Sequence, residues 1–327
     1  MKSVTRRAVM LLGMASVLMS AQPAAADDAQ GYPARAVKLI VPFAPGGGAD
    51  YFGRIIAERL SAQLGKPFVV ENRGGAGGAV GAEVAARAAP DGYTLVFVSN
   101  GFAVSPAVSK VAYDPLKDFT PIARVVDTSM VVGVHPSVPA DDLKGLVAYA
   151  KANPNQLSFG SSGIGGISHL ATEEFLLSTG ARMVHVPYKG TGPANIALVG
   201  GEIQVNVGDI GAVAELVRGG RVKALAIGSE ARSKLLPTVP TAAEAGFPEA
   251  KFGIWYGLLA PQGTPKEIVA LLNKEVNAAL RKPEVVEAFT ARFAAPAGGS
   301  PTDFARSIES DFNSWKAFAD RSGIKVQ

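Results

Sequence analysis

The 327-residue chain contains no cysteine, which excludes disulfide bonds, thiolate nucleophiles and iron–sulfur clusters. Attachment of a lipid to an N-terminal cysteine is excluded for the same reason. Histidine is scarce as well, and the three histidines, His135, His169 and His185, do not have the spacing of a metal site. The composition therefore predicts neither a metal centre nor a cofactor.

The chain also lacks an apolar run long enough to cross a membrane. The apolar stretch 8–21 has 14 residues, whereas a bilayer requires about 20. It follows Lys2, Arg6 and Arg7 and precedes Ala24-Ala25-Ala26, a pattern typical of an export signal. We expect residues 1–26 to be removed during export, by either the general secretory or the twin-arginine route.

Clustered basic charge is absent. The formal net charge is +4, but the export segment contributes three basic residues and no acidic ones, which leaves +1 for residues 27–327. A protein that binds nucleic acid needs a clustered basic face, and no long basic run is present. We therefore expect no nucleic-acid partner.

The chain does contain an alternation of strand-length apolar runs with amphipathic, helix-length segments. Such alternation predicts an α/β protein built from open, mostly parallel sheets. The expected strands are 37–43, 68–71, 94–99, 130–134, 157–160, 183–186, 203–207 and 222–227. Capping patterns at 264–267 and 300–303 predict the starts of two further helices.

Two apolar segments, 122–134 and 252–260, are expected to pair as a hinge between two domains. In this interpretation, residues 27–130 and 253–327 form one domain and residues 131–252 form the other. The length of the chain is sufficient for two cores of ordinary size.

Two strand-to-helix junctions carry the main functional signal. In the first, the strand 37–43 leads into the loop Ala44-Pro45-Gly46-Gly47-Gly48-Ala49-Asp50. In the second, the strand 157–160 leads into Ser161-Ser162-Gly163-Ile164-Gly165-Gly166. The first N–H groups of a helix have no intrahelical partner, and the helix dipole is positive there. One such loop in each domain predicts a cleft that binds a small anion from both sides.

Common enzyme signatures fail at the glycine-rich segments. Residues 75–80 and 163–168 depart from the dinucleotide pattern at the last position, and Gly65-Lys66 lacks the upstream glycine of a P-loop. Residues 160–164 lack the second glycine of a nucleophile elbow. An exported serine hydrolase remains an alternative, with Ser161 or Ser162 paired with His169, but no aspartate that would orient the histidine is identifiable.

Several polar residues lie where open α/β sheets bind ligands, beyond the carboxyl ends of strands. Asn100 and Asp209 follow two of the expected strands. Asp50 is expected to cap the first helix and so to fix the loop before it. His169 follows the second loop, where either the ligand or a loop group is its partner.

The motifs together resemble the substrate-binding proteins of tripartite tricarboxylate transporters, also called the Bug family. The similar segments are Pro45-Gly46-Gly47 with Asp50 and Gly53-Arg54, then 70–73, 75–78, 90–95, 160–163 with His169-Leu170, 186–190, 236–241 and 260–265. The likeness covers the chain after the export segment. Gly74 differs, because the family often has proline there.

The resemblance implies a type II periplasmic binding protein, with two α/β domains around a central cleft and a carboxylate held by loop amides, hydroxyls and waters. It implies no catalysis, a monomer in the periplasm, and delivery of a di- or tricarboxylate, an aromatic acid or an acidic amino acid to membrane transporter subunits. A sensor that docks on a receptor kinase is the alternative. Carried over by position, the expected ligand-binding residues are Phe43, Gly47, Gly48, Ala49, Asp50, Asn100, Ser161, Ser162, Gly163, His169, Thr191 and Asp209.

Overall fold

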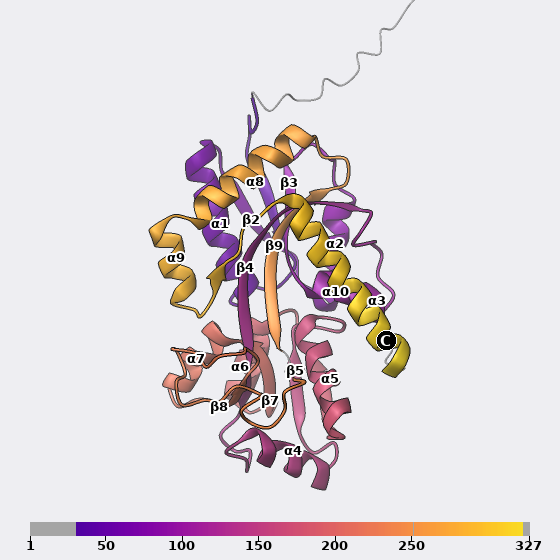
Figure 1. Cartoon of the computed structure of the whole chain (residues 1–327), viewed down its shortest axis with the longest axis vertical. Coiled ribbons are helices and arrows are strands. Elements are labelled where there is room, and N and C mark those ends of the chain that lie inside the picture. Colours follow the sequence, from indigo (N-terminus) through magenta and orange to yellow (C-terminus); the bar gives the residue numbers. More distant parts are fainter. Residues whose placement is uncertain (1–30, 251, 323–327) are drawn as a thin grey trace, which may run out of the picture.

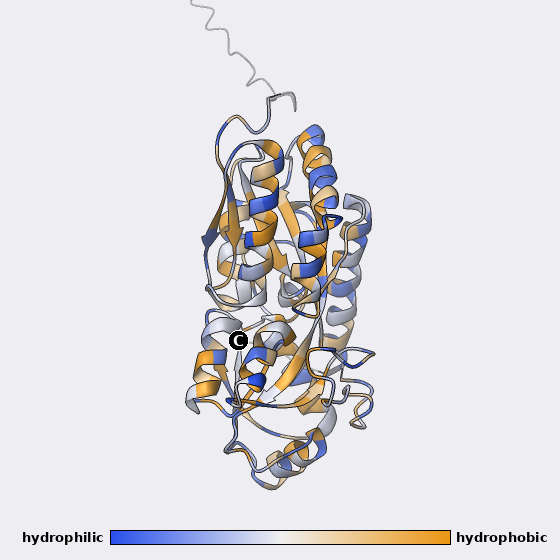
Figure 2. Ribbon diagram, turned by 90° about the vertical axis from the view of Figure 1, so that its left-hand side faces the viewer, coloured by the Kyte–Doolittle hydropathy of each residue, from blue (hydrophilic) through white to orange (hydrophobic). Residues whose placement is uncertain are grey.

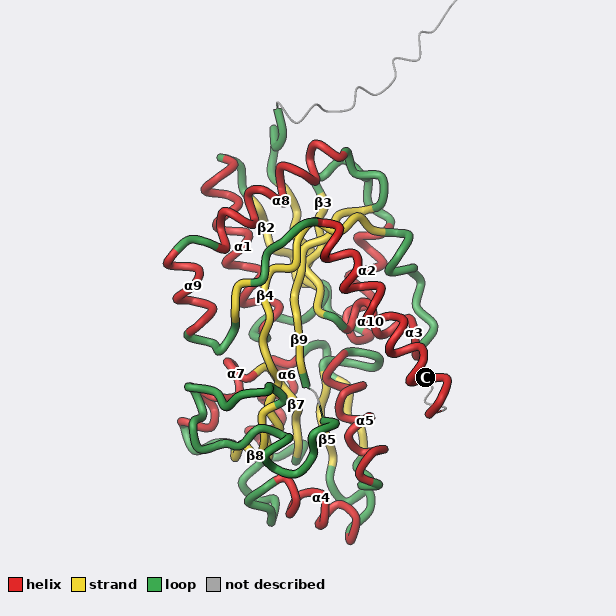
Figure 3. Tube along the Cα trace, in the orientation of Figure 1, coloured by secondary structure: helices red, strands yellow, loops and turns green. Residues whose placement is uncertain are grey.

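The computed structural model describes residues 31–250 and 252–322, so the predicted export signal lies outside the described residues. Two α/β lobes follow one another along the long axis of the molecule (Figure 1). Strands lie inside and helices outside in both lobes (Figure 3). The expected α/β class is confirmed.

The first lobe is built on three parallel strands, β1 (Val37–Val41), β2 (Phe68–Asn72) and β3 (Thr94–Ser99). Its helices come from both ends of the chain. They are α1 (Gly48–Leu64), α2 (Ala79–Ala86), α3 (Gly101–Val108), α8 (Lys266–Leu280), α9 (Pro283–Thr290) and α10 (Pro301–Ser322), with the 3-10 turn η1 (Ala76–Gly78) and the short strand β10 (Ala295–Pro296).

The second lobe is formed by the middle of the chain. Its strands are β5 (Ser158–Ser161), β6 (Val184–Pro187), β7 (Val205–Asp209) and β8 (Lys223–Ile227). β5 pairs in parallel with both β6 and β7. The helices of this lobe are α4 (Leu143–Ala152), α5 (Ile167–Thr179), α6 (Thr191–Gly200) and α7 (Ile210–Arg218).

Two long strands connect the lobes, β4 (Phe119–Val134) and β9 (Gly253–Pro261). β4 pairs antiparallel with β9 from Phe119 to Ser129 and then with β7 and β8 from Met130 to Val134. The expected pairing of segments 122–134 and 252–260 is therefore confirmed. β4 begins earlier than the expected strand 130–134, because its polar residues 127–129 remain extended opposite β9.

Burial explains why these segments form this fold. The inner strands β1, β3 and β9 are buried along most of their length and form nearly continuous apolar runs, whereas the edge strands β2 and β6 are partly exposed. The helices alternate apolar and polar faces (Figure 2). One close contact packs the last helix against a hinge strand. A Cβ at Gly257 of β9 would lie 2.2 Å from the Phe304 ring of α10, so only glycine leaves room for that ring.

The two capping predictions have opposite outcomes. At 300–303 the capping box is confirmed, since Ser300 Oγ accepts from the Asp303 N–H and Asp303 Oδ2 accepts from the Ser300 N–H. At 264–267 it is wrong, because the Thr264 hydroxyl donates to the Pro261 carbonyl and Pro265 is the N-cap of α8. Within the described residues, no helix combines the length and apolarity that a membrane span requires.

Candidate functional site

A cavity between the two lobes receives both junction loops. The space between its walls, counted together with the open solvent at its mouth, is about 360 Å³. Its wall is formed by Phe43, Gly47, Ala49, Ser99, Met130, Ser162, Ile167, Ser168, Thr191, Asp209, Ile254 and Tyr256. The wall contains no lysine or arginine, so an anion bound here would have to be stabilised mainly by dipoles and hydrogen bonds.

Four helices begin at this cavity: α1, α5, α6 and α7. Three of them start from glycine N-caps, Gly47, Gly166 and Gly190, and no side chain accepts a capping hydrogen bond there. The first N–H groups of these helices therefore remain available to a ligand, and the helix dipoles add positive potential at the same place. Two helix N-termini were expected from the sequence, and the tertiary structure adds two more.

The first loop is fixed by Asp50, but not in the expected way. The prediction that Asp50 caps α1 is wrong, because Gly47 is the N-cap and Asp50 is the third helical residue. Its Oδ2 accepts from the Gly46 N–H at 3.2 Å, and its Oδ1 accepts from Arg54 and Asn72. Burial raises the pKa of Asp50, but the hydrogen bonds from Arg54, Asn72 and Gly46 outweigh it and lower the pKa. The ionised Asp50 carboxylate therefore holds the first loop in place through its hydrogen bond with the Gly46 N–H.

In the second loop, Ser162 and Ser168 form the polar wall of the cavity. Ser168 Oγ accepts from the Ser162 N–H at 2.9 Å and lies 3.0 Å from Ser162 Oγ. The neighbouring Ser161 is fully buried and lies 2.6 Å from His185 Nε2. Ser168 is a wall residue that sequence reasoning missed; its place in the first turn of the helix after the second loop was the available signal.

A stacked pair of imidazoles supports the second loop from behind. The ring centroids of His169 and His185 are 3.7 Å apart. His169 Nδ1 accepts from the Gly165 N–H at 3.2 Å, so its partner is a loop group. Burial lowers the pKa of His169 to about 3, with a smaller contribution from His185, and burial lowers that of His185 to about 4. Both rings are neutral near pH 7.

This arrangement does not favour the hydrolase alternative. The serine that meets a histidine is Ser161, whose side chain is fully buried and does not form part of the cavity wall. Ser162 does form part of the wall, but its hydroxyl partner is Ser168. A nucleophile must both reach its substrate and contact its base, and neither serine meets both conditions.

Asp209 is the most buried ionisable group of the wall. It caps α7, with Oδ1 accepting from the N–H groups of Gly211 and Ala212 at 3.1 and 3.3 Å. Burial raises its pKa to about 6, against the opposing effects of the Ala212 N–H, Arg292 and the Gly211 N–H. Its other oxygen, Oδ2, is buried next to Gly48 and has no hydrogen-bond partner within the described part of the chain.

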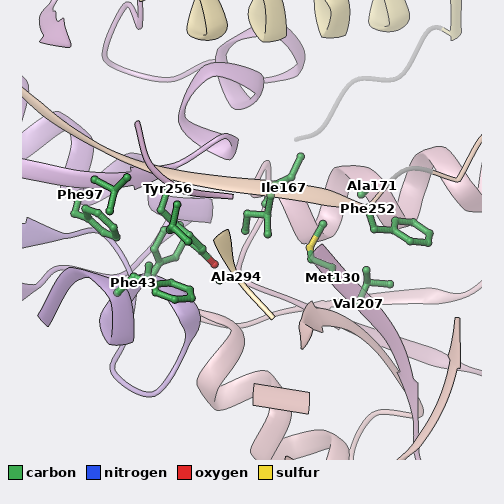
Figure 4. Packing of buried hydrophobic residues seen from close by; sticks show 14 of the residues in the cluster. Phe43, Phe97, Met130, Ile167, Ala171, Val207, Phe252, Tyr256 and Ala294 are labelled. Atoms are coloured by element: carbon green, nitrogen blue, oxygen red, sulfur yellow. The ribbon is translucent and has the colours of Figure 1, made fainter. Parts of the chain in front are cut away.

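The remaining wall is apolar and comes partly from the hinge. Met130 lies on β4, and Ile254 and Tyr256 lie on β9. Figure 4 shows Phe43 and Tyr256 close together, with Ile167 and Met130 along the hinge strands. The hinge residues were missed from the sequence, although a tyrosine within an otherwise apolar run was a visible signal. They can pack against the carbon body of a ligand.

The structure thus divides the twelve expected residues into two groups. Phe43, Gly47, Ala49, Ser162, Thr191 and Asp209 form part of the wall, whereas Gly48, Asp50, Asn100, Ser161, Gly163 and His169 do not. Asn100 precedes α3 and donates to the Gly253 carbonyl. Arg73 and Lys189, which lie in two of the segments that resemble the family, are also outside the wall.

The lobes are in direct contact around the cavity. The Ala44 N–H of the first lobe donates to the Lys189 carbonyl of the second at 2.7 Å. Arg292 and Glu215 form an ion pair across the lobes at 3.2 Å. A Cβ at Gly192 would lie 2.6 Å from the Pro45 carbonyl oxygen, so the two loops approach backbone to backbone. The cleft is therefore closed in this structure.

Comparison with known proteins identifies relatives along nearly the whole chain. A family model described as "Tripartite tricarboxylate transporter family receptor" matches residues 52–324. Protein BugT of Bordetella pertussis is 39% identical over 310 residues, which cover 94% of each protein. A solved structure described as a periplasmic transporter is 43% identical, with a TM-score of 0.87 over 90% of this chain and 99% of that one.

Two further structures contain ligands. Rpa4515 of R. palustris, solved with adipate, is 35% identical, with a TM-score of 0.86 over 90% of this chain and 99% of that one. MatC from Rhodopseudomonas palustris, solved with bound malate, is also 35% identical, with a TM-score of 0.85 over 88% of this chain and 99% of that one. These similarities extend over both lobes.

Proposed function

This chain belongs to the tripartite tricarboxylate transporter receptor family, and we propose that it captures a small organic carboxylate between its lobes for a membrane transporter of that type. Family and structural neighbours are periplasmic binding proteins, so the chain is a binding protein and not an enzyme. The observation that carries the proposed ligand class is the convergence of helix N-termini with open glycine caps on one closed cavity. The adipate and malate in two neighbours support it.

The energetics are sufficient without a basic side chain. Micromolar affinity requires about 8 kcal/mol. Each helix terminus contributes about 0.3–2 kcal/mol, and each hydrogen bond to a charged group about 1.5–3 kcal/mol. The three helix termini with open N–H groups, the serine hydroxyls and burial of the carbon body against Met130 and Ile254 supply the required free energy.

A thermal-shift screen of the mature protein tests this proposal. Mono-, di- and tricarboxylates, aromatic acids and acidic amino acids should be compared. A ligand at about 100 times its Kd should stabilise the fold by about 2.7 kcal/mol, which raises the melting temperature by about 2–4 °C per kcal/mol. If no carboxylate raises the melting temperature, the proposed ligand class is wrong.

Bulky replacements at the cavity should remove this shift. In Gly47→Leu the new Cβ would lie 2.6 Å from Thr191 Oγ1, and Ser162→Leu places an apolar side chain in the polar wall. Both variants should remain folded and lose the ligand-induced shift, because the added atoms occupy the space of the ligand. Gly31→Leu is the matched control, because nothing lies within 4 Å of its ideal Cβ and its φ, like that of Gly47, is outside the left-handed region. Normal binding by both cavity variants would place the ligand elsewhere.

We propose the following organisation for the whole protein. Residues 1–26 form an export signal cleaved near Ala26, by the secretory or the twin-arginine route. The mature chain is a monomer, with one domain formed by 27–130 and 253–327 and the other by 131–252. Mass spectrometry of the exported protein tests the cleavage site, and co-purification with membrane subunits or with a receptor kinase distinguishes a transport component from a sensor.

A further inference from the structure

Asp209, a residue of the cavity wall, has one carboxylate oxygen without a hydrogen-bond partner among the described residues. The residue is 1% exposed. Its Oδ1 is occupied by the N–H groups of Gly211 and Ala212, which begin α7. Its Oδ2 is buried and receives no hydrogen bond from any described residue. A buried carboxylate oxygen without a donor is costly, so a partner of complementary chemistry is expected when the cavity is filled.

The position of this oxygen is defined by the N-terminus of α1. An ideal Cβ at Gly48, the first residue of α1, would lie 2.9 Å from Asp209 Oδ2 and 2.7 Å from the Tyr256 hydroxyl. Both oxygens therefore pack against the Cα of Gly48, and Asp209 Oδ2 lies beside the first turn of α1. The first N–H groups of α1 are hydrogen-bond donors, and Asp209 Oδ2 is an acceptor close to them.

The two features favour different parts of one ligand. A carboxylate at the N-terminus of α1 accepts from the open N–H groups. Asp209 repels a second carboxylate oxygen unless a proton lies between them. A hydroxyl or ammonium group on the carbon next to the bound carboxylate would donate to Oδ2 and remove this repulsion.

We propose that Asp209 determines ligand specificity, making the site selective for carboxylates with a hydroxyl or ammonium group on the adjacent carbon. This inference rests on the proposed function, since it assumes that a carboxylate occupies the cavity. It narrows the ligand class from small organic carboxylates to 2-hydroxy and 2-amino acids.

The charged groups around Asp209 allow a test by pH. Tyr256 faces it from β9 and Arg292 from the segment after α9, and the Arg292 guanidinium is shared with Glu215 of α7. Burial raises the pKa of Asp209 to about 6. At pH 8 the side chain is an ionised acceptor, and below about pH 6 it is protonated and can donate to a carboxylate.

Matched ligands test the proposal by titration calorimetry at pH 8. The probes are succinate, malate and aspartate, with adipate, 2-hydroxyadipate and 2-aminoadipate as a longer series. In each series the members differ only in the group on the carbon next to a carboxylate. We expect the substituted members of the series that binds to have a Kd about 10- to 100-fold lower than the unsubstituted one.

The Asp209→Asn variant is the matched control. Its amide oxygen can keep the α7 cap, while its NH₂ group replaces the acceptor Oδ2 by a donor. The preference for substituted ligands should disappear in this variant, with the melting temperature of the free protein close to that of the wild type.

The pH series gives a second readout. Between pH 6 and pH 8 the wild-type Kd for the unsubstituted ligand should rise about tenfold per pH unit, because Asp209 must take up a proton. The Kd of Asp209→Asn should be flat over the same range.

The outcomes separate the two levels of the proposal. Tight binding of unsubstituted ligands by the wild type at pH 8, unchanged in Asp209→Asn, would overturn the role of Asp209 and leave the proposed function intact. Failure of every carboxylate to bind the wild type would overturn the proposed function and this inference with it.

Discussion

Replacing Gly192 by alanine should weaken carboxylate binding by about 5- to 150-fold, although Gly192 does not form part of the cavity wall. Its new Cβ would lie 2.6 Å from the Pro45 carbonyl oxygen, 3.1 Å from the Gly46 carbonyl carbon and 3.3 Å from the Gly47 nitrogen. All three atoms belong to the opposite lobe, so the clash arises only when the lobes close. Overpacking of this kind costs about 1–3 kcal/mol, and about 1.4 kcal/mol corresponds to a tenfold change in Kd.

Gly200 provides a matched control in the same helix. A Cβ at Gly200 would meet only Glu202 Oε1, at 4.0 Å. Alanine is a better helix former than glycine by about 1 kcal/mol, so neither Gly192→Ala nor Gly200→Ala should destabilise the free protein. Titration calorimetry gives the two Kd values, and small-angle scattering shows whether the ligand still compacts each variant. Equal, wild-type affinity in both variants would show that binding does not require this contact between the loops.

The stability of the protein should fall steeply as the pH decreases from about 6.5 to 4. The cause is the pair His169 and His185, whose pKa values burial lowers to about 3 and about 4. In the unfolded chain both imidazoles bind protons below about pH 6.5, whereas the folded protein keeps them neutral. The unfolded state therefore binds more protons in this window, and stability is lost as the pH falls. The buried His169 should contribute on the order of 3 kcal/mol at pH 4, at 1.36 kcal/mol per pH unit, and the more exposed His185 should contribute less because solvent screens it.

Denaturant titrations between pH 7.5 and 4 measure this loss. Glu173 lies 3.7 Å from His169, and burial raises the pKa of its carboxyl, which partly offsets the loss at acid pH. The double variant His169→Gln, His185→Gln should have a lower free energy of unfolding than the wild type at pH 7.5. That free energy should decrease less than in the wild type between pH 7.5 and pH 4. His135→Gln changes a histidine outside the pair. Its free energy of unfolding should decrease between pH 7.5 and pH 4 by as much as that of the wild type. An equal loss in the double variant would assign the acid sensitivity to other groups.

Proton uptake by the pair should also affect the ligand site. His185 lies 2.6 Å from Ser161 Oγ, and His169 accepts from the Gly165 N–H. A protonated Nδ1 of His169 could no longer accept that hydrogen bond, so the second loop would lose one of its two supports from the histidine pair. The pair therefore couples the stability of the fold to the geometry of a loop that forms the cavity wall.

Much of this architecture follows from local sequence. Strand-length apolar runs separated by amphipathic segments specify an α/β fold, because each strand must be covered on both faces and each helix on one. The two glycine-rich junctions specify helix starts without capping side chains, since glycine has no side chain that accepts from the first N–H groups. The family motifs identify both loops. Each of these features is formed by residues that are close together in the sequence, so the sequence is sufficient to predict it.

The tertiary structure decided which residues share the cavity. Ser161 and Ser162 are adjacent in the sequence, yet Ser162 lies in the wall and Ser161 lies against His185. Asp50 fits the sequence pattern of a cap but is the third residue of its helix. Thr264 was expected to cap α8 but donates to a preceding carbonyl. A shift of one residue in a helix start redirects a side chain by about 100°, which sequence patterns do not resolve.

The amino-acid sequence by itself determined the class of fold and the two loops that precede helix N-termini, because these follow from periodicity and backbone freedom within short segments. Only the tertiary structure brought Met130, Ile254 and Tyr256 of the hinge into the wall and left one oxygen of Asp209 unpaired beside them. The reason is that residues far apart in the chain meet only through strand pairing and closure of the lobes.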